Sequence, residues 1–176
     1  DVISRENIRN VRFLTDLVKF ISDNIGKNIS ANSISKFMRS QQITISPTLT
    51  SNYLEFLCNA YIINRANRFD IHGKRLFETN EKYYFEDIGL RNALVGINLR
   101  NDIEKLLENV VYLNLRNSGY NVTVGQLGNR EIDFVAEKEG RRIYVQVCYL
   151  LTTQETIDRE FSNLRMIKDD YPKVVI

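Results

Sequence analysis

Apolar residues in the first third of the chain recur at the spacing of amphipathic helices. The first such segment covers residues 5–25 and is followed by Gly26, a residue type that commonly ends helices. Ser30 is a favourable N-cap for a second, shorter segment, and Ser46-Pro47 is a typical start for a third. The pattern therefore predicts three helices joined by short polar connections.

Two strand-like segments follow these helices. They cover residues 62–69 and 74–79, on either side of a turn at Asp70-Ile71-His72-Gly73, and residues 86–96 then favour a short helix. Three helices followed by a hairpin are typical of a winged helix-turn-helix. We therefore expect an N-terminal domain of this type, with its connecting helix, over residues 1–97.

The rest of the chain, residues 98–176, predicts a second domain with the order αβββαβ. Asp102 is expected to cap a long helix that ends at Gly119. The later elements are expected at residues 120–124, 130–137 and 142–149 for three strands, 153–168 for a helix, and from 173 onward for a last strand. Because this last strand is cut short and the chain lacks an initiator Met, we expect a piece of a longer α/β (α+β) protein.

Strand periodicity then suggests where polar chemistry gathers in the second domain. Alternation puts Asp133 on the same face as Val135, and it puts Gln146 on the same face as Cys148 of the next strand. Antiparallel pairing of these strands would bring Asp133 close to Gln146. Glu108, on the preceding helix, can point to the same place, so we expect one polar site beside the hairpin.

This constellation resembles the PD-(D/E)XK nuclease superfamily, whose pattern is a helix Glu, a strand Asp and a Glu-x-Lys or Gln-x-Lys on the next strand. The resemblance implies a restriction-endonuclease-like fold, in which Glu108 and Asp133 would hold Mg²⁺ and Gln146 would open the last motif. Cys148 takes the position of the lysine that orients the attacking water. A thiol carries no positive charge at neutral pH, and Gln146 removes an anionic ligand. Both departures argue against cleavage.

A closer resemblance covers nearly the whole chain. It is similar to the domain of unknown function that follows the ATPase module in many prokaryotic AAA-superfamily ATP-binding proteins. The blocks that carry it are residues 84–92 (YFEDIGLRN), 108–112 (ENVVY), 131–135 (EIDFV) and 144–149 (YVQVCY). This resemblance implies a preceding ATPase module of the same chain, which would bind ATP, and a C-terminal winged-helix plus nuclease-like region. No P-loop occurs within the given residues, so we expect no ATP hydrolysis by them alone.

In a winged helix, the third helix reads the DNA major groove. Its exposed positions here are expected to be Thr48, Thr50, Ser51 and Asn52, yet no Lys or Arg lies between positions 47 and 61. Phosphate neutralisation supplies much of the affinity of DNA-binding proteins. The hairpin supplies cations instead, namely Arg65, Arg68, Lys74 and Arg75. These residues favour a DNA interface; a docking surface for protein, with the charges as a solvated face, is the alternative.

Composition limits the remaining function classes. The formal net charge is only +2, so any basic surface must be local. The single histidine, His72, excludes metal sites built from several histidines within these residues. The cysteines Cys58 and Cys148 lie in apolar segments without metal-type spacing, and no apolar stretch is long enough to cross a membrane. We therefore expect a cytoplasmic protein.

Three functions remain open at this point. The first is a non-catalytic DNA- or partner-binding C-terminal region of an ATPase. The second is an active metal-dependent nuclease in which another cation, such as Lys105, replaces the missing lysine. The third is a protein-interaction module that holds ATPase subunits together.

Overall fold

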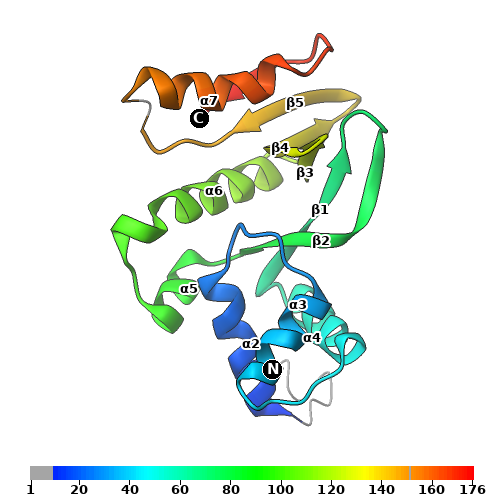
Figure 1. Ribbon diagram of the computed structural model, residues 1–176, viewed down its shortest axis with the longest axis vertical. Helices are drawn as coiled ribbons and strands as arrows, with labels where there is room; N and C mark the ends of the chain where they lie inside the picture. Colours follow the sequence, from blue (N-terminus) through cyan, green and yellow to red (C-terminus); the bar gives the residue numbers. More distant parts are fainter. Residues whose placement is uncertain (1–9, 151) are drawn as a thin grey trace. The chain divides into compact units, whose positions relative to one another are not determined.

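The computed structural model describes residues 10–150 and 152–176, which form two compact units (Figure 1). The first unit extends to Arg65 and includes Lys82–Ile97, and the second holds Ala66–Glu81 and Asn98–Ile176. The hairpin after the third helix thus begins and ends in the first unit, while its tip belongs to the second. Residues 5–9 of the predicted first helix lie outside the described residues.

The described part of the first unit contains four helices, and their ends follow the capping residues in the sequence. The helices are α2 (Val11–Asp23), α3 (Ala31–Ser40), α4 (Pro47–Asn59) and α5 (Ile88–Val95). Ser30 forms a capping box with Ser33 at the start of α3, and Ser46 caps α4, whose first turn contains Pro47. Phe13 of α2 packs edge-to-face against Tyr53 of α4, with ring centroids 4.9 Å apart. Each predicted helix of this unit is present, although the first begins at Val11 and ends at Asp23 rather than covering residues 5–25.

The described strands form one mixed sheet in the order β2-β1-β3-β4-β5-β6. The elements are β1 (Ile63–Asp70), β2 (Arg75–Phe85), α6 (Leu99–Asn117), β3 (Asn121–Leu127), β4 (Arg130–Lys138), β5 (Arg141–Gln146), α7 (Gln154–Arg165) and β6 (Lys173–Val175). β1 pairs in parallel with β3, and β5 pairs in parallel with β6. The chain is therefore a mixed α/β protein. Within the described ranges, no helix is both long and apolar enough to cross a membrane.

The predicted start of the long helix is wrong. The helix α6 begins at Leu99 with Asn98 as N-cap, rather than after Asp102. Asp102 lies in the first turn, where its carboxylate accepts a hydrogen bond from the backbone N–H of Asn98 at 3.2 Å. A carboxylate inside the first turn is favourable near the positive end of the helix dipole. Asp102 therefore indicates the first turn of the helix and not the N-cap position.

The helices α6 and α7 cover opposite faces of strands β4 and β5 (Figure 1). Tyr112 of α6 packs against Phe134 of β4, with ring centroids 5.8 Å apart. On the other face, Leu164 at the C-terminal end of α7 packs into a buried cluster with Val135 and Tyr144. Each face of β4 and β5 is thus covered by one helix, which leaves the ends of these strands as the places where polar groups can gather.

Strand β4 contains a β-bulge at Asp133 and Phe134. Thr123 of β3 pairs with Val135 and Gly125 pairs with Ile132, so two residues of β4 oppose the single Val124. A side chain built at Gly125 would meet both Ile132 and Val135, each at 2.9 Å, which places these two residues on one face. The predicted alternation, with Asp133 and Val135 on the same face, is therefore wrong. The extra residue shifts the alternation of side chains between the two faces by one position at this point.

Candidate functional site

The bulge directs Asp133 toward the end of β5. Its Oδ2 atom accepts a hydrogen bond from the backbone N–H of Val147 at 2.7 Å. Val147 is the first residue after β5. The carboxylate of β4 therefore bonds to the chain that follows β5, just beyond the last pair of β4 and β5 residues. A charged acceptor strengthens such a bond. Asp133, predicted as a metal ligand, is thus held by the backbone of the strand that carries Gln146.

Gln146 is the last residue of β5 and is buried, with 8% of its surface exposed. It lies two residues after Tyr144, so alternation places it on the face covered by α7. Its side-chain Oε1 is buried without a hydrogen-bond partner among the described residues. A buried amide oxygen without a donor costs about 1–3 kcal/mol. Such an atom marks a place where a donor from water, an ion or a ligand would be favourable.

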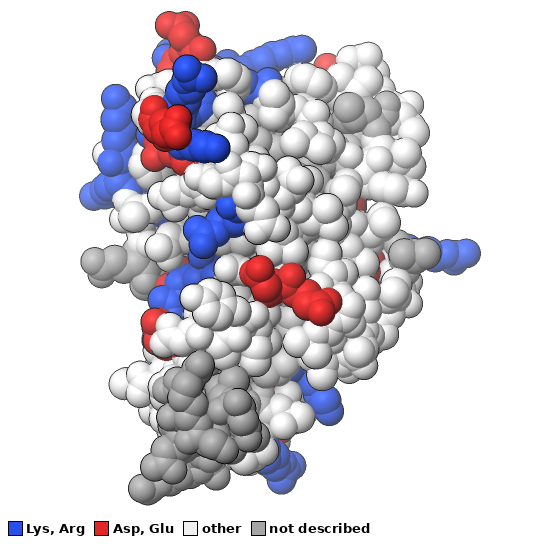
Figure 2. All heavy atoms as spheres, turned by 180° about the vertical axis from the view of Figure 1, so that it is seen from behind, with Lys and Arg blue, Asp and Glu red and all other residues white. Residues whose placement is uncertain are grey.

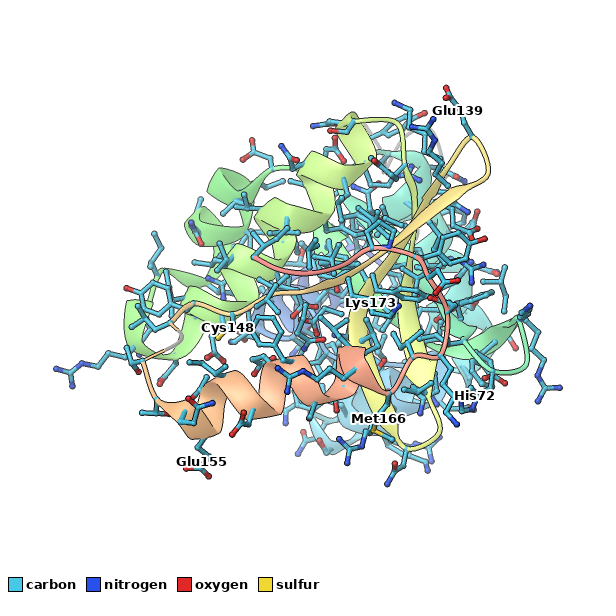
Figure 3. The ribbon with its side chains drawn as sticks, turned by 90° about the horizontal axis from the view of Figure 1, so that it is seen from above. His72, Glu139, Cys148, Glu155, Met166 and Lys173 are labelled. Atoms are coloured by element: carbon cyan, nitrogen blue, oxygen red, sulfur yellow. The ribbon has the colours of Figure 1, made fainter. Side chains whose placement is uncertain are left out.

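Glu160 of α7 is a further buried acid of the second unit that the sequence reading missed. It is 7% exposed and precedes Leu164 by one helical turn, on the stripe that packs onto the sheet. In Figure 3, α7 runs from the end marked by Cys148 and Glu155 toward Met166 and His72. Glu160 lies near the middle of this helix, which spans Gln154–Arg165. The detectable signal was its spacing of four and seven residues from Leu164 and Ile167.

Glu108 is a half-buried residue of α6, one turn before Tyr112. Because Tyr112 packs against Phe134, Glu108 belongs to the helix that covers the face opposite α7. Lys105, the cation considered as a substitute for the missing lysine, donates to Asp102 Oδ1 at 2.8 Å. It is therefore already neutralised within the first turns of α6.

Cys148 lies within the predicted third strand but beyond the end of the observed strand β5. The third strand was expected to reach residue 149, but β5 ends at Gln146, and the Cys148 backbone N–H donates to Ile176 O at 2.8 Å. Its thiol donates to Leu150 O at 3.4 Å, a weak hydrogen bond. In the nuclease pattern, this position carries the lysine that orients the attacking water. Here it carries a thiol that is hydrogen-bonded to a carbonyl oxygen two residues away.

The oxygen atoms at this site fall short of a magnesium centre. Mg²⁺ is bound by oxygen ligands, usually including one or two carboxylates, in near-octahedral geometry. Here Asp133 is bonded to Val147, and its neighbour Gln146 is neutral. In the part of the chain that the structure describes, three or more His, Cys, Asp or Glu side chains nowhere come together to hold a metal ion. The residues present do not fit the metal that the nuclease resemblance implies.

The predicted DNA-reading helix α4 exposes three of its four named residues. Thr48, Ser51 and Asn52 are exposed, whereas Thr50 is fully buried. The Thr50 hydroxyl lies 2.9 Å from that of Ser35 on α3 and donates to Ser46 O at 3.0 Å. The expectation that Thr50 is exposed is therefore wrong, because a short polar side chain can be buried when its hydroxyl is satisfied.

The hairpin cations differ in how far they are already paired. Arg65 donates to Glu55 at 2.9 Å, Arg68 bonds to Gln126, and Arg75 lies 3.8 Å from Asp70. Lys74 is exposed and has no ion-pair partner among the described residues. Arg68, Lys74 and Arg75 belong to the second unit, whereas Arg65 and α4 belong to the first. The predicted nucleic-acid residues are thus divided between the two units.

Charge is not concentrated in one broad patch on the face seen in Figure 2. Cationic and anionic side chains are interspersed there, with wide uncharged areas between them. This distribution agrees with the small formal net charge of +2. Binding of an anionic polymer would therefore depend on a few local cations rather than on the field of the whole protein.

Comparison with known proteins places the chain in a family. Residues 1–101 match the family described as Domain of unknown function (DUF8612). The chain belongs to this family. An uncharacterized protein of Haemophilus influenzae is 36% identical over 178 residues, which cover 100% of this chain and 43% of that protein. The uncharacterized protein MJ1544 of Methanocaldococcus jannaschii is 30% identical over 155 residues, which cover 86% of this chain and 34% of that protein.

The DUF8612 match covers the described first unit, the hairpin tip that belongs to the second unit, and the start of α6. The chain spans less than half the length of the two curated relatives. No solved structure shows a significant match to the chain.

Proposed function

We propose that this chain is the C-terminal region of a prokaryotic AAA-superfamily ATPase and that it binds DNA without cutting it. In this proposal, the N-terminal helices and the hairpin act as a winged helix. The second unit is a nuclease-like scaffold that has lost its catalytic groups. The element order, three helices and a hairpin followed by αβββαβ, supports both assignments.

One observation carries the non-catalytic part of the proposal. The Asp133 carboxylate is engaged by the backbone N–H of Val147, and the neighbouring Gln146 is a buried neutral amide. Cleavage by the mechanism of the PD-(D/E)XK nucleases needs a hard cation held by carboxylates and a positive charge near the attacking water. The site offers neither a second strand carboxylate nor a cation at Cys148.

An active nuclease with a substitute lysine is less well supported. Lys105 Nζ is bonded to Asp102 Oδ1 at 2.8 Å, and the side chain of Asp102 is only 11% exposed. Moving Lys105 into the site would break this ion pair at a largely buried carboxylate, which is costly. The geometry therefore favours a scaffold in which no other cation takes the place of the lysine that is missing at Cys148.

Protein docking is a second candidate because of a groove in the first unit. The groove has a volume of about 470 Å³ and lies between α2 and α3. Phe20 and Phe37 pack together there, with centroids 4.6 Å apart, and Phe37 is 43% exposed. Arg12 and Asp16 stand on its rim. An exposed aromatic residue with charged neighbours is typical of protein interfaces.

The salt dependence of DNA binding tests the proposed function. We expect the chain to bind duplex DNA with an affinity that falls as salt rises, because phosphate contacts release counterions. Replacing Lys74 and Arg75 together by Gln should lower the slope of log K against log salt by roughly two units, about one for each phosphate contact. Fluorescence anisotropy with a labelled duplex at several salt concentrations measures this slope.

The matched control replaces Arg116 and Arg141 by Gln. Both are exposed arginines outside the proposed DNA surface, so the slope should not change. Absence of binding by the native chain, or the same slope for both double variants, would remove the DNA-binding proposal and leave protein docking as the better one.

A further inference from the structure

A pocket of about 360 Å³ lies in the second unit, at the other end of α7 from Gln146. His72 and Lys74 of the hairpin turn line one side, and Lys168 and Tyr171, which follow α7, line another. In Figure 3, His72 lies near Met166, at the C-terminal end of α7. The pocket is thus built by two loops from distant parts of the sequence.

Arg142 forms a rigid cationic wall of this pocket. Its guanidinium carbon lies 4.9 Å from the centre of the Phe69 ring and 5.5 Å from that of Tyr171. Its Nε donates to Glu137 at 2.6 Å, and its Nη1 donates to the Tyr144 hydroxyl at 3.3 Å. Burial lowers the pKa of Arg142, but these hydrogen bonds outweigh it and the net shift is upward. The cation is fixed in place and remains charged.

The other cations of the pocket have no acidic partner. Lys74 and Lys168 are exposed and form no ion pair with any residue that the structure describes. The acid of the pocket, Asp169, already accepts from the Tyr144 hydroxyl at 2.6 Å and from Lys173 Nζ at 3.1 Å. Burial raises the pKa of Asp169, but these bonds outweigh it and hold the pKa below its ordinary value. Two positive charges are therefore left uncompensated.

We propose that this pocket binds the phosphate monoester group of a nucleotide, either free or at the 5′ end of a nucleic-acid strand. A phosphate monoester carries close to two negative charges at pH 7, which matches the two unpaired lysines. Arginine adds planar hydrogen-bond donors suited to phosphate oxygens. The inference concerns the second unit alone and does not rest on DNA binding by α4.

The apolar part of the pocket suits the rest of a nucleotide. Ile71 and Ile167 are buried beneath the cations, and the Tyr171 ring is 42% exposed. An exposed aromatic ring beside a cationic site can stack on a base, a contact worth about 1–3 kcal/mol per base in single-strand binding proteins. The pocket is at the small end of the roughly 300–1,000 Å³ found for ligand sites, which suits a single nucleotide unit.

Binding of small probes to the whole chain tests this inference. Isothermal titration should show binding of AMP and no binding of adenosine, since only AMP carries the phosphate. A short single-stranded oligonucleotide with a 5′ phosphate should bind more tightly than the same strand with a 5′ hydroxyl if the strand end is the source. Equal binding of the two strands, with AMP still bound, assigns the pocket to free nucleotides.

The variant Lys168→Gln should weaken AMP binding by roughly tenfold, the effect of losing about 1.4 kcal/mol of interaction. Lys36→Gln makes the same chemical change at an exposed site on α3 and should leave binding unchanged. Failure of AMP to bind, or equal loss of affinity in both variants, would overturn the inference. Loss of duplex binding in the Lys74 and Arg75 variant has no bearing on this outcome, because the Lys168 comparison uses AMP.

Discussion

Replacing Arg91 by Met is expected to lower the free energy of unfolding of the first unit by roughly 3–5 kcal/mol. Arg91 is 1% exposed, and its Nε donates to Ser22 O on α2 at 3.0 Å. Its Nη1 donates to Gly96 O at 3.1 Å, so one side chain ties α5 to α2 and to the segment after α5. Methionine can fill the volume but leaves both carbonyl oxygens without a donor, and hydrogen bonds to charged groups contribute about 1.5–3 kcal/mol each.

Arg12→Met is the matched control for this experiment. The Arg12 side chain is 85% exposed and its ion pair with Asp16 spans 4.0 Å, so the same substitution should change stability by less than about 0.5 kcal/mol. Urea unfolding followed by circular dichroism measures both variants. A similar midpoint for Arg91→Met and the native chain would contradict the role assigned to this residue.

Replacing Gly125 by Ala is expected to destabilise the second unit by about 1–3 kcal/mol, the usual range for overfilling a packed core. Gly125 is buried opposite Ile132, and a Cβ atom there would lie 2.9 Å from Ile132 Cβ and 2.9 Å from Val135 Cγ2. The Ile132 Cβ atom is fixed directly to the strand backbone and Val135 is a branched side chain, so the two cannot both move away from this contact. The bulge at Asp133 therefore depends on a residue without a side chain on the neighbouring strand.

A double-mutant cycle with Val135→Ala separates this clash from a general weakening of the strand. Val135→Ala removes the Cγ2 atom that the new Cβ would meet. Gly125→Ala should therefore cost less in the Val135→Ala background than in the native chain. Equal costs in the two backgrounds, measured by urea unfolding, would show that the close packing at the bulge is not what requires glycine.

The order of the elements was readable from the sequence because it depends on local signals. Ser30 and Ser46 start helices by accepting hydrogen bonds from backbone N–H groups of the first turn, and Pro47 has no backbone N–H group to satisfy. Each of these signals acts within four residues. Gly140, with a positive φ of 75°, closes the turn between β4 and β5, as such turns require. At these positions, the conformation that the local sequence prefers is also the one that the packed structure requires. The sequence pattern therefore predicts the observed elements.

The geometry at Asp133 could not be predicted by the same means. A β-bulge adds one residue to one strand only, and its cause is the pairing with β3, which is remote in sequence. Thr50 was misjudged for a similar reason, because its burial depends on the hydroxyl of Ser35. Alternation and polarity describe one strand or helix at a time. They therefore miss features that arise from a partner element.

Cleavage by the isolated chain is the most direct test of the central claim that the nuclease-like scaffold binds without cutting. We expect no useful cleavage of DNA or RNA by the native chain with Mg²⁺ or Mn²⁺, because Cys148 and Gln146 supply neither the cation nor the second strand carboxylate. The double variant Gln146→Glu with Cys148→Lys restores both charges and should gain affinity for Mn²⁺. Robust metal-dependent cleavage by the native chain, abolished by Asp133→Ala, would contradict the account.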